Sequence, residues 1–269
     1  MMRLSPWQTR IQRAEHLAKQ YPFVAEILGF YAEVARFQED FHGRLEATAA
    51  RPSKVAPAER KVGPPELPEL IASFGPFLSL VVKLGPAQLA TLARDLQQGP
   101  HESWSELLDA SWNTTQSASE VPEVFLARAF LQPYAEFVRS RLALKSDGYT
   151  HPLCPFCNRR PGLAVFRQQG DGARRSLMCS FCLAEWEFRR IVCAGCGEES
   201  NTKLPVYTAS DFDYIRVEGC DTCHTYLKGV DLTKNGLAEP MVDEIAAAPL
   251  DLWAQEHGYS KLQRNLMGM

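Results

Sequence analysis

The chain has 269 residues, of which 45% are hydrophobic and 23% charged, a composition that excludes a disordered or fibrous protein. Its formal net charge of −3 argues against general affinity for nucleic acid. The N-terminus lacks the apolar core of a signal peptide, and the longest strongly apolar run, residues 77–82, is too short to cross a bilayer. We therefore expect a cytoplasmic protein that makes no membrane contact and keeps its thiols reduced.

Residues 1–147 contain no cysteine and are predicted to form an all-α domain. Ser5 followed by Pro6 is a typical helix start, with an N-cap residue and proline at the first helical position. A proline-rich linker is expected at about residues 49–68, and Pro133 should kink the last helix or mark a join. The predicted helices cover residues 7–19, 21–47, 76–84, 86–98, 102–112 and 121–144.

The second of these helices repeats an apolar residue every three or four positions, which is typical of a face packed into a core. The residues of this face are Phe23, Ile27, Phe30, Val34, Phe37 and Phe41. His16, His42 and His101 are isolated in this half and have no second ligand at metal spacing. Since no catalytic triad, phosphate-binding glycine loop or paired-carboxylate motif stands out, we expect a scaffold or docking surface and not an enzyme.

All eight cysteines lie between residues 154 and 223, as four C-x2-C pairs separated by 21, 10 and 23 residues. This spacing predicts two tandem units whose first cysteines are 39 residues apart. Each unit offers four thiolates, which is the ligand set of a closed tetrahedral metal site. The predicted ligands are Cys154, Cys157, Cys179 and Cys182 in the first site, and Cys193, Cys196, Cys220 and Cys223 in the second.

Two metal ions per chain are therefore expected, iron or zinc, because tetrathiolate sites accept either. A crossed pairing of the cysteine pairs stays open, since the 10-residue gap could also close a small loop. Four disulfides are not expected in a reducing compartment, and no βαβ pattern suggests a thioredoxin-like dithiol. His151 and His224 lie beside cysteine pairs but are predicted not to be ligands, because four thiolates already complete each site.

Each unit also contains three strand-like runs, which with two cysteine turns make a rubredoxin-like or zinc-ribbon fold. The runs cover residues 163–167, 174–178 and 185–191 in the first unit, and 204–210, 214–217 and 225–230 in the second. The residue after the second cysteine of such a turn often needs a positive φ, which favours glycine and then asparagine. Asn158 and Gly197 fit that position, and the second turn of each unit lacks this feature, so each unit has one well-marked turn and one plainer turn.

The predicted fold is therefore α+β, an all-α domain followed by two tandem rubredoxin-like or zinc-ribbon units and a short C-terminal helical segment. The expected boundaries are 1–147 for the helical domain, 148–192 and 193–235 for the ribbons, and 236–269 for the last segment. Helices are predicted there at 240–247 and 249–257, with Gly258 ending the second.

Charge is distributed unevenly over the two ribbons. Residues 154–192 contain seven arginines and three acidic residues, and residues 193–231 contain three basic and seven acidic residues. The simplest interpretation is that the basic unit docks on the acidic unit. The alternative is that the arginines bind an acidic partner or nucleic acid. These arginines are Arg159, Arg160, Arg174, Arg175, Arg189 and Arg190.

Several sequence motifs together indicate a known family. They are Cys-Pro-Phe-Cys from Cys154, Cys-Ser-Phe-Cys-Leu-Ala-Glu-Trp from Cys179, Arg-Ile-Val-Cys-Ala-Gly-Cys-Gly from Arg190, Glu-Gly-Cys-Asp-Thr-Cys-His-Thr-Tyr-Leu-Lys from Glu218, and Leu-Asp-Leu-Trp-Ala-Gln-Glu-His-Gly-Tyr from Leu250. With these motifs the chain resembles the formate dehydrogenase accessory (formation) protein family, FdhE. The specific match covers about residues 150–262, and Asn158 stands where glycine is expected.

The resemblance implies a cytoplasmic, non-catalytic maturation factor needed for the activity of a respiratory formate dehydrogenase. Such a factor contacts the catalytic subunit of the dehydrogenase and carries rubredoxin-like sites that can hold iron. Two alternatives from other classes stay open, a rubredoxin-like electron carrier and, with less support, a zinc-ribbon protein that binds nucleic acid.

Overall fold

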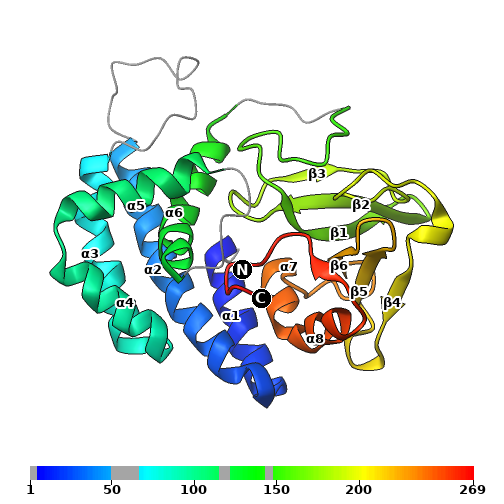
Figure 1. The fold of residues 1–269 in the computed structure, drawn as a ribbon, viewed down its shortest axis with the longest axis horizontal. Helices are drawn as coiled ribbons and strands as arrows, with labels where there is room; N and C mark the ends of the chain where they lie inside the picture. The colour runs from blue at the N-terminus through cyan, green and yellow to red at the C-terminus, as the bar shows by residue number, and fades with distance from the viewer. Residues whose placement is uncertain (1–4, 50–66, 115–121, 143–147) are drawn as a thin grey trace.

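The computed structural model describes residues 5–49, 67–114, 122–142 and 148–269. A helical half lies beside a half built on one β-sheet (Figure 1). The helical half consists of α1 (Pro6–Gln20), the short 3-10 helix η1 (Pro22–Val24), α2 (Ala25–Ala49), α3 (Leu67–Leu84), α4 (Ala87–Gln98), α5 (His101–Asn113) and α6 (Pro122–Ser140). No helix in these ranges is long and apolar enough to cross a bilayer.

The first helix begins where the sequence predicts. Ser5 is its N-cap, and a capping box joins the Ser5 hydroxyl to the Gln8 N–H at 3.0 Å. The predicted aromatic face of α2 also packs into a core: Phe41 stacks on Phe130 of α6 with ring centroids 5.0 Å apart, and Phe37 meets Phe77 of α3 at 5.2 Å. Phe23 is the exception, since it is 59% exposed at the end of this face.

One predicted helix start is wrong. Pro76 lies inside α3 and does not begin it, although proline lacks the N–H that a helix interior uses. Packing explains why α3 continues through Pro76, because the buried residues before and after it lie on one face of the helix and pack into the same core. They are Leu70, Phe74, Phe77, Leu78 and Val81. Most of the predicted proline-rich linker, residues 50–66, lies outside the described residues.

The sheet joins both cysteine units. Its strands are β1 (Pro161–Gln169), β2 (Gly172–Cys179), β3 (Glu185–Glu187), β4 (Val206–Thr208), β5 (Ile215–Cys220), β6 (Thr225–Asp231) and the short β7 (Ser260–Lys261). Their order is β3-β2-β1-β6-β5-β4, with β7 pairing with β6. Within each unit the pairs are antiparallel, as the ribbon prediction requires, but β1 and β6 pair in parallel and connect the units. Both units thus contribute strands to one sheet, and the predicted boundary at residues 192/193 lies in the connection between β3 and β4.

Two C-terminal helices cover one face of this sheet. They are α7 (Pro240–Ala246) and α8 (Ala248–Glu256), and Gly258 follows with φ of 82°. Ile215, Val217 and Tyr226 of the sheet share a buried cluster with Leu250 and Ala254 of α8. The chain then returns as β7 alongside β6.

The helical half is fixed to this assembly through α1, which lies between α2 and α7 (Figure 1). Arg13 of α1 donates from Nε to Asp243 Oδ2 of α7 at 2.9 Å, and Tyr214 donates to the same carboxylate at 2.7 Å. One turn earlier in α1, Arg10 makes a bidentate pair with Glu136 of α6, both bonds being 2.9 Å. Because these pairs are buried, removal of one partner would leave an uncompensated charge inside the protein.

Candidate metal centres

The first four-cysteine group forms where the turn before β1 meets the end of β2. Cys154 Sγ lies 3.5 Å from Cys182 Sγ, and Cys157 Sγ lies 3.4 Å from Cys179 Sγ. All four sulfurs lie within 4.8 Å of one another. Antiparallel pairing of β1 with β2 brings the two turns together, although they are 21 residues apart in the sequence.

The second group repeats this arrangement between the turn after β3 and the β5–β6 hairpin. Cys193 Sγ lies 3.7 Å from Cys223 Sγ, and Cys196 Sγ lies 3.7 Å from Cys220 Sγ. The structure thus brings all eight predicted cysteines into two groups, in the uncrossed pairing that their spacing favours. None of them forms a disulfide.

The sulfur separations fit a tetrahedral ion. Zinc–sulfur bonds of about 2.3 Å give a tetrahedron whose edges are roughly 3.8 Å, close to the observed distances, whereas a disulfide needs about 2.05 Å. Four soft thiolates at this geometry suit zinc or iron. Burial raises the pKa of Cys179 well above its ordinary value and that of Cys193 to about 12, so a cation is needed to hold all four thiols of each group as thiolates.

Backbone N–H groups of the turns also point at the cysteine sulfurs. Amide N–H groups of Phe156, Phe181 and Gly195 donate to the sulfur two residues before them, at 3.4, 3.4 and 3.3 Å respectively. In all four turns the residue after the second cysteine has a positive φ: Asn158 56°, Leu183 52°, Gly197 79° and His224 53°.

The plainer second turn of each unit thus has the same backbone conformation as the well-marked first turn. Leu183 and His224 adopt the same left-handed backbone as Asn158 and Gly197, although a side chain at this conformation is unfavourable by roughly 1–2 kcal/mol. Backbone hydrogen bonds close these turns: Cys179 N–H donates to Ala184 O, and His224 N–H donates to Cys220 O, both at 2.8 Å.

The first group is buried against the helical half. Cys154, Cys179 and Cys182 are each at most 2% exposed. The Arg159 guanidinium lies 3.8 Å from the centre of the Phe181 ring and donates to the carbonyl oxygens of Ser111, Trp112 and Thr114 at 2.5–3.1 Å. These carbonyls stand at the end of α5, where a helix leaves acceptors without intrahelical partners.

A second guanidinium lies beside the same group. Arg128 of α6 donates to Ser180 O at 3.3 Å, and its pKa is lowered to about 10 by burial and by the nearby charge of Arg159. A divalent ion with four thiolates carries a net charge of −2, which these two guanidinium groups would offset. The helical half thus supplies packing and, through Arg128, one of the two compensating charges to the first group.

The second group faces the outside of the molecule. Cys196 is exposed, Cys193 and Cys223 are partly buried, and only Cys220 is fully buried. One of its outer contacts is a hydroxyl, since the Cys223 sulfur lies 3.1 Å from Thr225 Oγ1. The two groups therefore share their geometry but differ in access from solvent.

The two histidines beside the turns do not belong to either group of ligands found in the described chain. The backbone carbonyl of His151 accepts a hydrogen bond from Trp186 Nε1 at 3.0 Å, and His224 supplies its backbone to the last turn. Their exclusion as ligands stays a prediction.

The expected docking of the basic unit on the acidic unit is confirmed for two arginines. Arg175 of β2 donates to Glu218 of β5 at 2.7 and 3.0 Å, and Arg189 forms a bidentate pair with Glu199 at 2.7 Å. Arg159 is used differently, since it binds backbone carbonyls of α5. The sequence could not reveal that contact, because every residue has a backbone carbonyl and the residue type does not mark the acceptor.

Comparisons with known proteins agree with this architecture. Residues 153–190 match the family model described as FdhE, central domain, and residues 191–267 match FdhE, C-terminal domain. A protein named FdhE homolog from Aquifex aeolicus is 28% identical, over 96% of this chain and 94% of its own length. One from Pseudomonas aeruginosa is 26% identical, over 96% of this chain and 88% of its own.

A solved structure has the same fold. The crystal structure of the FdhE protein from Pseudomonas aeruginosa aligns with a TM-score of 0.68, over 99% of this chain and 97% of that one. Its sequence identity is 22%, so this likeness concerns the fold.

Proposed function

The chain belongs to the FdhE family, and on this premise we propose that it is an accessory factor needed for the activity of a respiratory formate dehydrogenase. In this proposal it works in the cytoplasm, contacts the catalytic subunit of the dehydrogenase and performs no reaction of its own. The observation that carries the proposal is the pair of four-cysteine groups in one sheet. This sheet packs against the helical half.

We propose that each group holds one metal ion, iron or zinc, through its four cysteine sulfurs. A bound ion would supply folding free energy to turns that are too small to be stable alone, on the order of 10 kcal/mol for structural zinc. The protein's own residues keep the turns in place through the N–H donors to sulfur and the two guanidinium groups beside the first site. A surface stiffened in this way loses little conformational entropy when it docks a partner.

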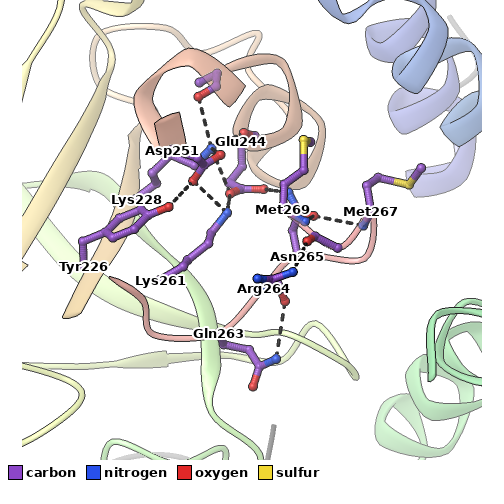
Figure 2. Close-up of polar contacts among 12 residues, drawn as sticks. Tyr226, Lys228, Glu244, Asp251, Lys261, Gln263, Arg264, Asn265, Met267 and Met269 are labelled. Carbon is purple, nitrogen blue, oxygen red and sulfur yellow. Dashed lines mark hydrogen bonds and ion pairs between the residues drawn. The ribbon is translucent and has the colours of Figure 1, made fainter. Parts of the chain in front are cut away.

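The buried charges near the C-terminus satisfy one another (Figure 2). Lys228 donates from Nζ to Asp251 Oδ2 and to Glu244 O, both at 2.6 Å, and Tyr226 donates to Asp251 Oδ1 at 2.7 Å. Lys261 pairs with Glu244 and Asp251. Two ammonium groups thus face two carboxylates, which is a structural network joining β6, α7, α8 and β7.

The proposal is tested by deleting the gene in its host and measuring formate dehydrogenase activity together with the amount of the catalytic polypeptide. Activity should fall while the polypeptide is still made. The purified chain should bind the purified catalytic subunit. Normal activity in the deletion strain would contradict the proposal.

A second candidate function, a rubredoxin-like electron carrier, is favoured by one observation. Cys196 is exposed, and an electron carrier needs its metal site near the surface. The Cys193→Ser/Cys196→Ser variant separates the two functions. If it still binds the catalytic subunit but no longer supports dehydrogenase activity, the second site has a redox role. Loss of both properties favours docking.

Nucleic-acid binding has less support. Of the six arginines that suggested it, Arg159 binds carbonyls of α5, and Arg175 and Arg189 are paired with carboxylates of the second unit. Arg174 lies 3.8 Å from Glu187. Few cationic groups are then left for phosphates.

A further inference from the structure

The face of the sheet opposite α7 and α8 carries a groove of about 400 Å³. Strand registers place its residues on one side, because Phe166 of β1 is opposite Arg175 of β2, and Val206 of β4 is opposite Glu218 of β5. The groove lies between the segment 190–195, which leads into the second cysteine group, and the start of β4. Cys193 and Cys220 form part of its wall, so whatever binds there lies against the second group.

The groove has an excess of positive charge. Arg175, Arg190 and Arg216 line it together with one carboxylate, Glu218. Arg175 already uses that carboxylate through two hydrogen bonds to Oε2. Arg190 is exposed and makes no hydrogen bond or ion pair with any residue that the structure describes. Three guanidinium groups and one carboxylate thus leave the groove with a net positive charge, with Arg190 unpaired among the described residues and Arg216 sharing Glu218 through an ion pair of 3.5 Å.

Arg216 is held ready for such a ligand. Its guanidinium carbon lies 3.3 Å from the centre of the Phe166 ring, and its buried Nε has no hydrogen-bond partner, since Glu218 Oε1 is 3.5 Å away. The strand beneath is shaped for this stacking, because a Cβ at Gly229 would come within 2.8 Å of Phe166. A planar guanidinium fixed on an aromatic face keeps its fork of donors for a carboxylate.

The rims of the groove are apolar and the sheet ends beside it. Ile191 on one rim is 51% exposed and Val206 on the other is 54% exposed. Val206 belongs to β4, which is the last strand in the sheet order, and no other strand in the described part of the chain pairs with its outer edge. An exposed strand edge with apolar pockets can bind an extended peptide, whereas a small anion would use neither the edge nor the apolar rims.

We propose that this groove binds an extended segment of the partner protein in which an acidic residue is flanked by apolar ones. The acidic side chain pairs with Arg216 and Arg190, while its neighbours cover Ile191 and Val206. This inference rests on the proposed function, because it names the surface through which the catalytic subunit is held. It also places the bound segment against the solvent-facing cysteine group.

The test compares Arg190→Glu and Arg216→Gln with Arg94→Glu as the matched control. Arg94 is exposed on α4, far along the chain from the groove, and its substitution makes the same charge change as that of Arg190. The dissociation constant for the purified catalytic subunit of the formate dehydrogenase is measured by titration at two salt concentrations. We expect at least tenfold weaker binding for Arg190→Glu and Arg216→Gln, with a smaller salt dependence, and a change below twofold for Arg94→Glu. Metal content and melting temperature, measured on the same samples, should stay at the wild-type values for Arg190→Glu.

A peptide array of the catalytic subunit provides the second measurement. The wild-type chain should select peptides with an acidic residue between apolar ones, and changing that residue to lysine should restore binding to Arg190→Glu. If both groove variants bind the subunit as tightly as the wild-type chain, the groove is not the docking site, while the docking function itself is retained. If the wild-type chain does not bind the subunit, both fail. If Arg190→Glu instead abolishes binding of a labelled single-stranded oligonucleotide while binding of the subunit is unchanged, the groove is a nucleic-acid site and the inference is overturned.

Discussion

Arg159 and Phe181 join the two halves of the chain. The guanidinium of Arg159 lies 3.8 Å from the centre of the Phe181 ring, which is between the last two cysteines of the first group, and it caps the carbonyl end of α5 at the same time. One side chain thus links the end of a helix to a metal-binding turn. Its neighbour Arg160 is exposed and serves as a control.

Substituting Arg159 by Ala should lower the free energy of unfolding by about 2–4 kcal/mol, because three charge-assisted hydrogen bonds and a cation–π contact are lost together. Arg160→Ala should change it by less than about 0.5 kcal/mol. Urea unfolding followed by circular dichroism measures both values. Equal stability of the two variants would mean that the Arg159 contacts do not hold the halves together.

Metal content should be two ions per chain in protein purified without oxygen under reducing conditions. The Cys193→Ser/Cys196→Ser variant should lose one ion and keep its helical half folded, because the second group is at the outside of the molecule. The Cys154→Ser/Cys157→Ser variant should also lose one ion but be much less stable, since its site is buried between the halves. Elemental analysis and thermal unfolding test these outcomes. Fewer than two tightly held ions in the wild type would contradict the assignment of the sites.

Substituting His151 or His224 by Ala should leave the metal content at two ions per chain. Four sulfurs complete each tetrahedron, and neither imidazole is grouped with them. The loss of one ion from either variant, again measured by elemental analysis, would show that the ligand set has been assigned incorrectly.

The difference in exposure predicts the order in which the cysteines react after a chelator is added. Cys196 should be alkylated first, followed by Cys193 and Cys223, while the buried sulfurs of the first group react only when the protein unfolds. Peptide mass spectrometry after timed iodoacetamide treatment gives this order. Simultaneous labelling of Cys154 and Cys196 would indicate that both sites open together.

Acid should weaken the C-terminal charge network through Glu244. Burial opposes ionisation of Glu244, but Lys228 and Lys261 outweigh it and hold the pKa of its carboxyl at about 2, against 4.5 for an ordinary glutamate. A carboxyl with a depressed pKa stabilises the fold above its unfolded pKa, and this contribution is lost as the pH falls from about 5 to about 2. The contribution is on the order of 3 kcal/mol.

The measurement compares the wild type with Glu244→Gln over that pH range. The difference in unfolding free energy between them should shrink as the pH falls, because the wild-type carboxyl becomes neutral like the amide. Release of metal in acid affects both proteins alike, so the difference isolates the network. A constant difference from pH 6 to pH 2.5 would show that Glu244 does not carry the pH dependence.

Elements whose signal is local could be predicted from the amino-acid sequence. Cysteine spacing predicts the two groups of four, because a pair of thiolates on one tight turn needs only a second turn to meet it. Ser5 and Pro6 predict the first helix through capping, and the aromatic repeat of α2 predicts its buried face. Each of these depends on residues close together in the chain or on a chemistry that few residue types share.

How these parts are joined depends on tertiary contacts that the sequence does not show. The parallel pairing of β1 with β6 joins the ribbons into one sheet. No residue pattern predicts this pairing, because its hydrogen bonds are made by backbone groups. Pro76 stays inside α3 and Leu183 adopts a positive φ because packing against other elements outweighs a local preference of a few kcal/mol. For the same reason the different exposure of the two cysteine groups, which have nearly identical spacing, is set by what the helical half covers and not by the cysteines themselves.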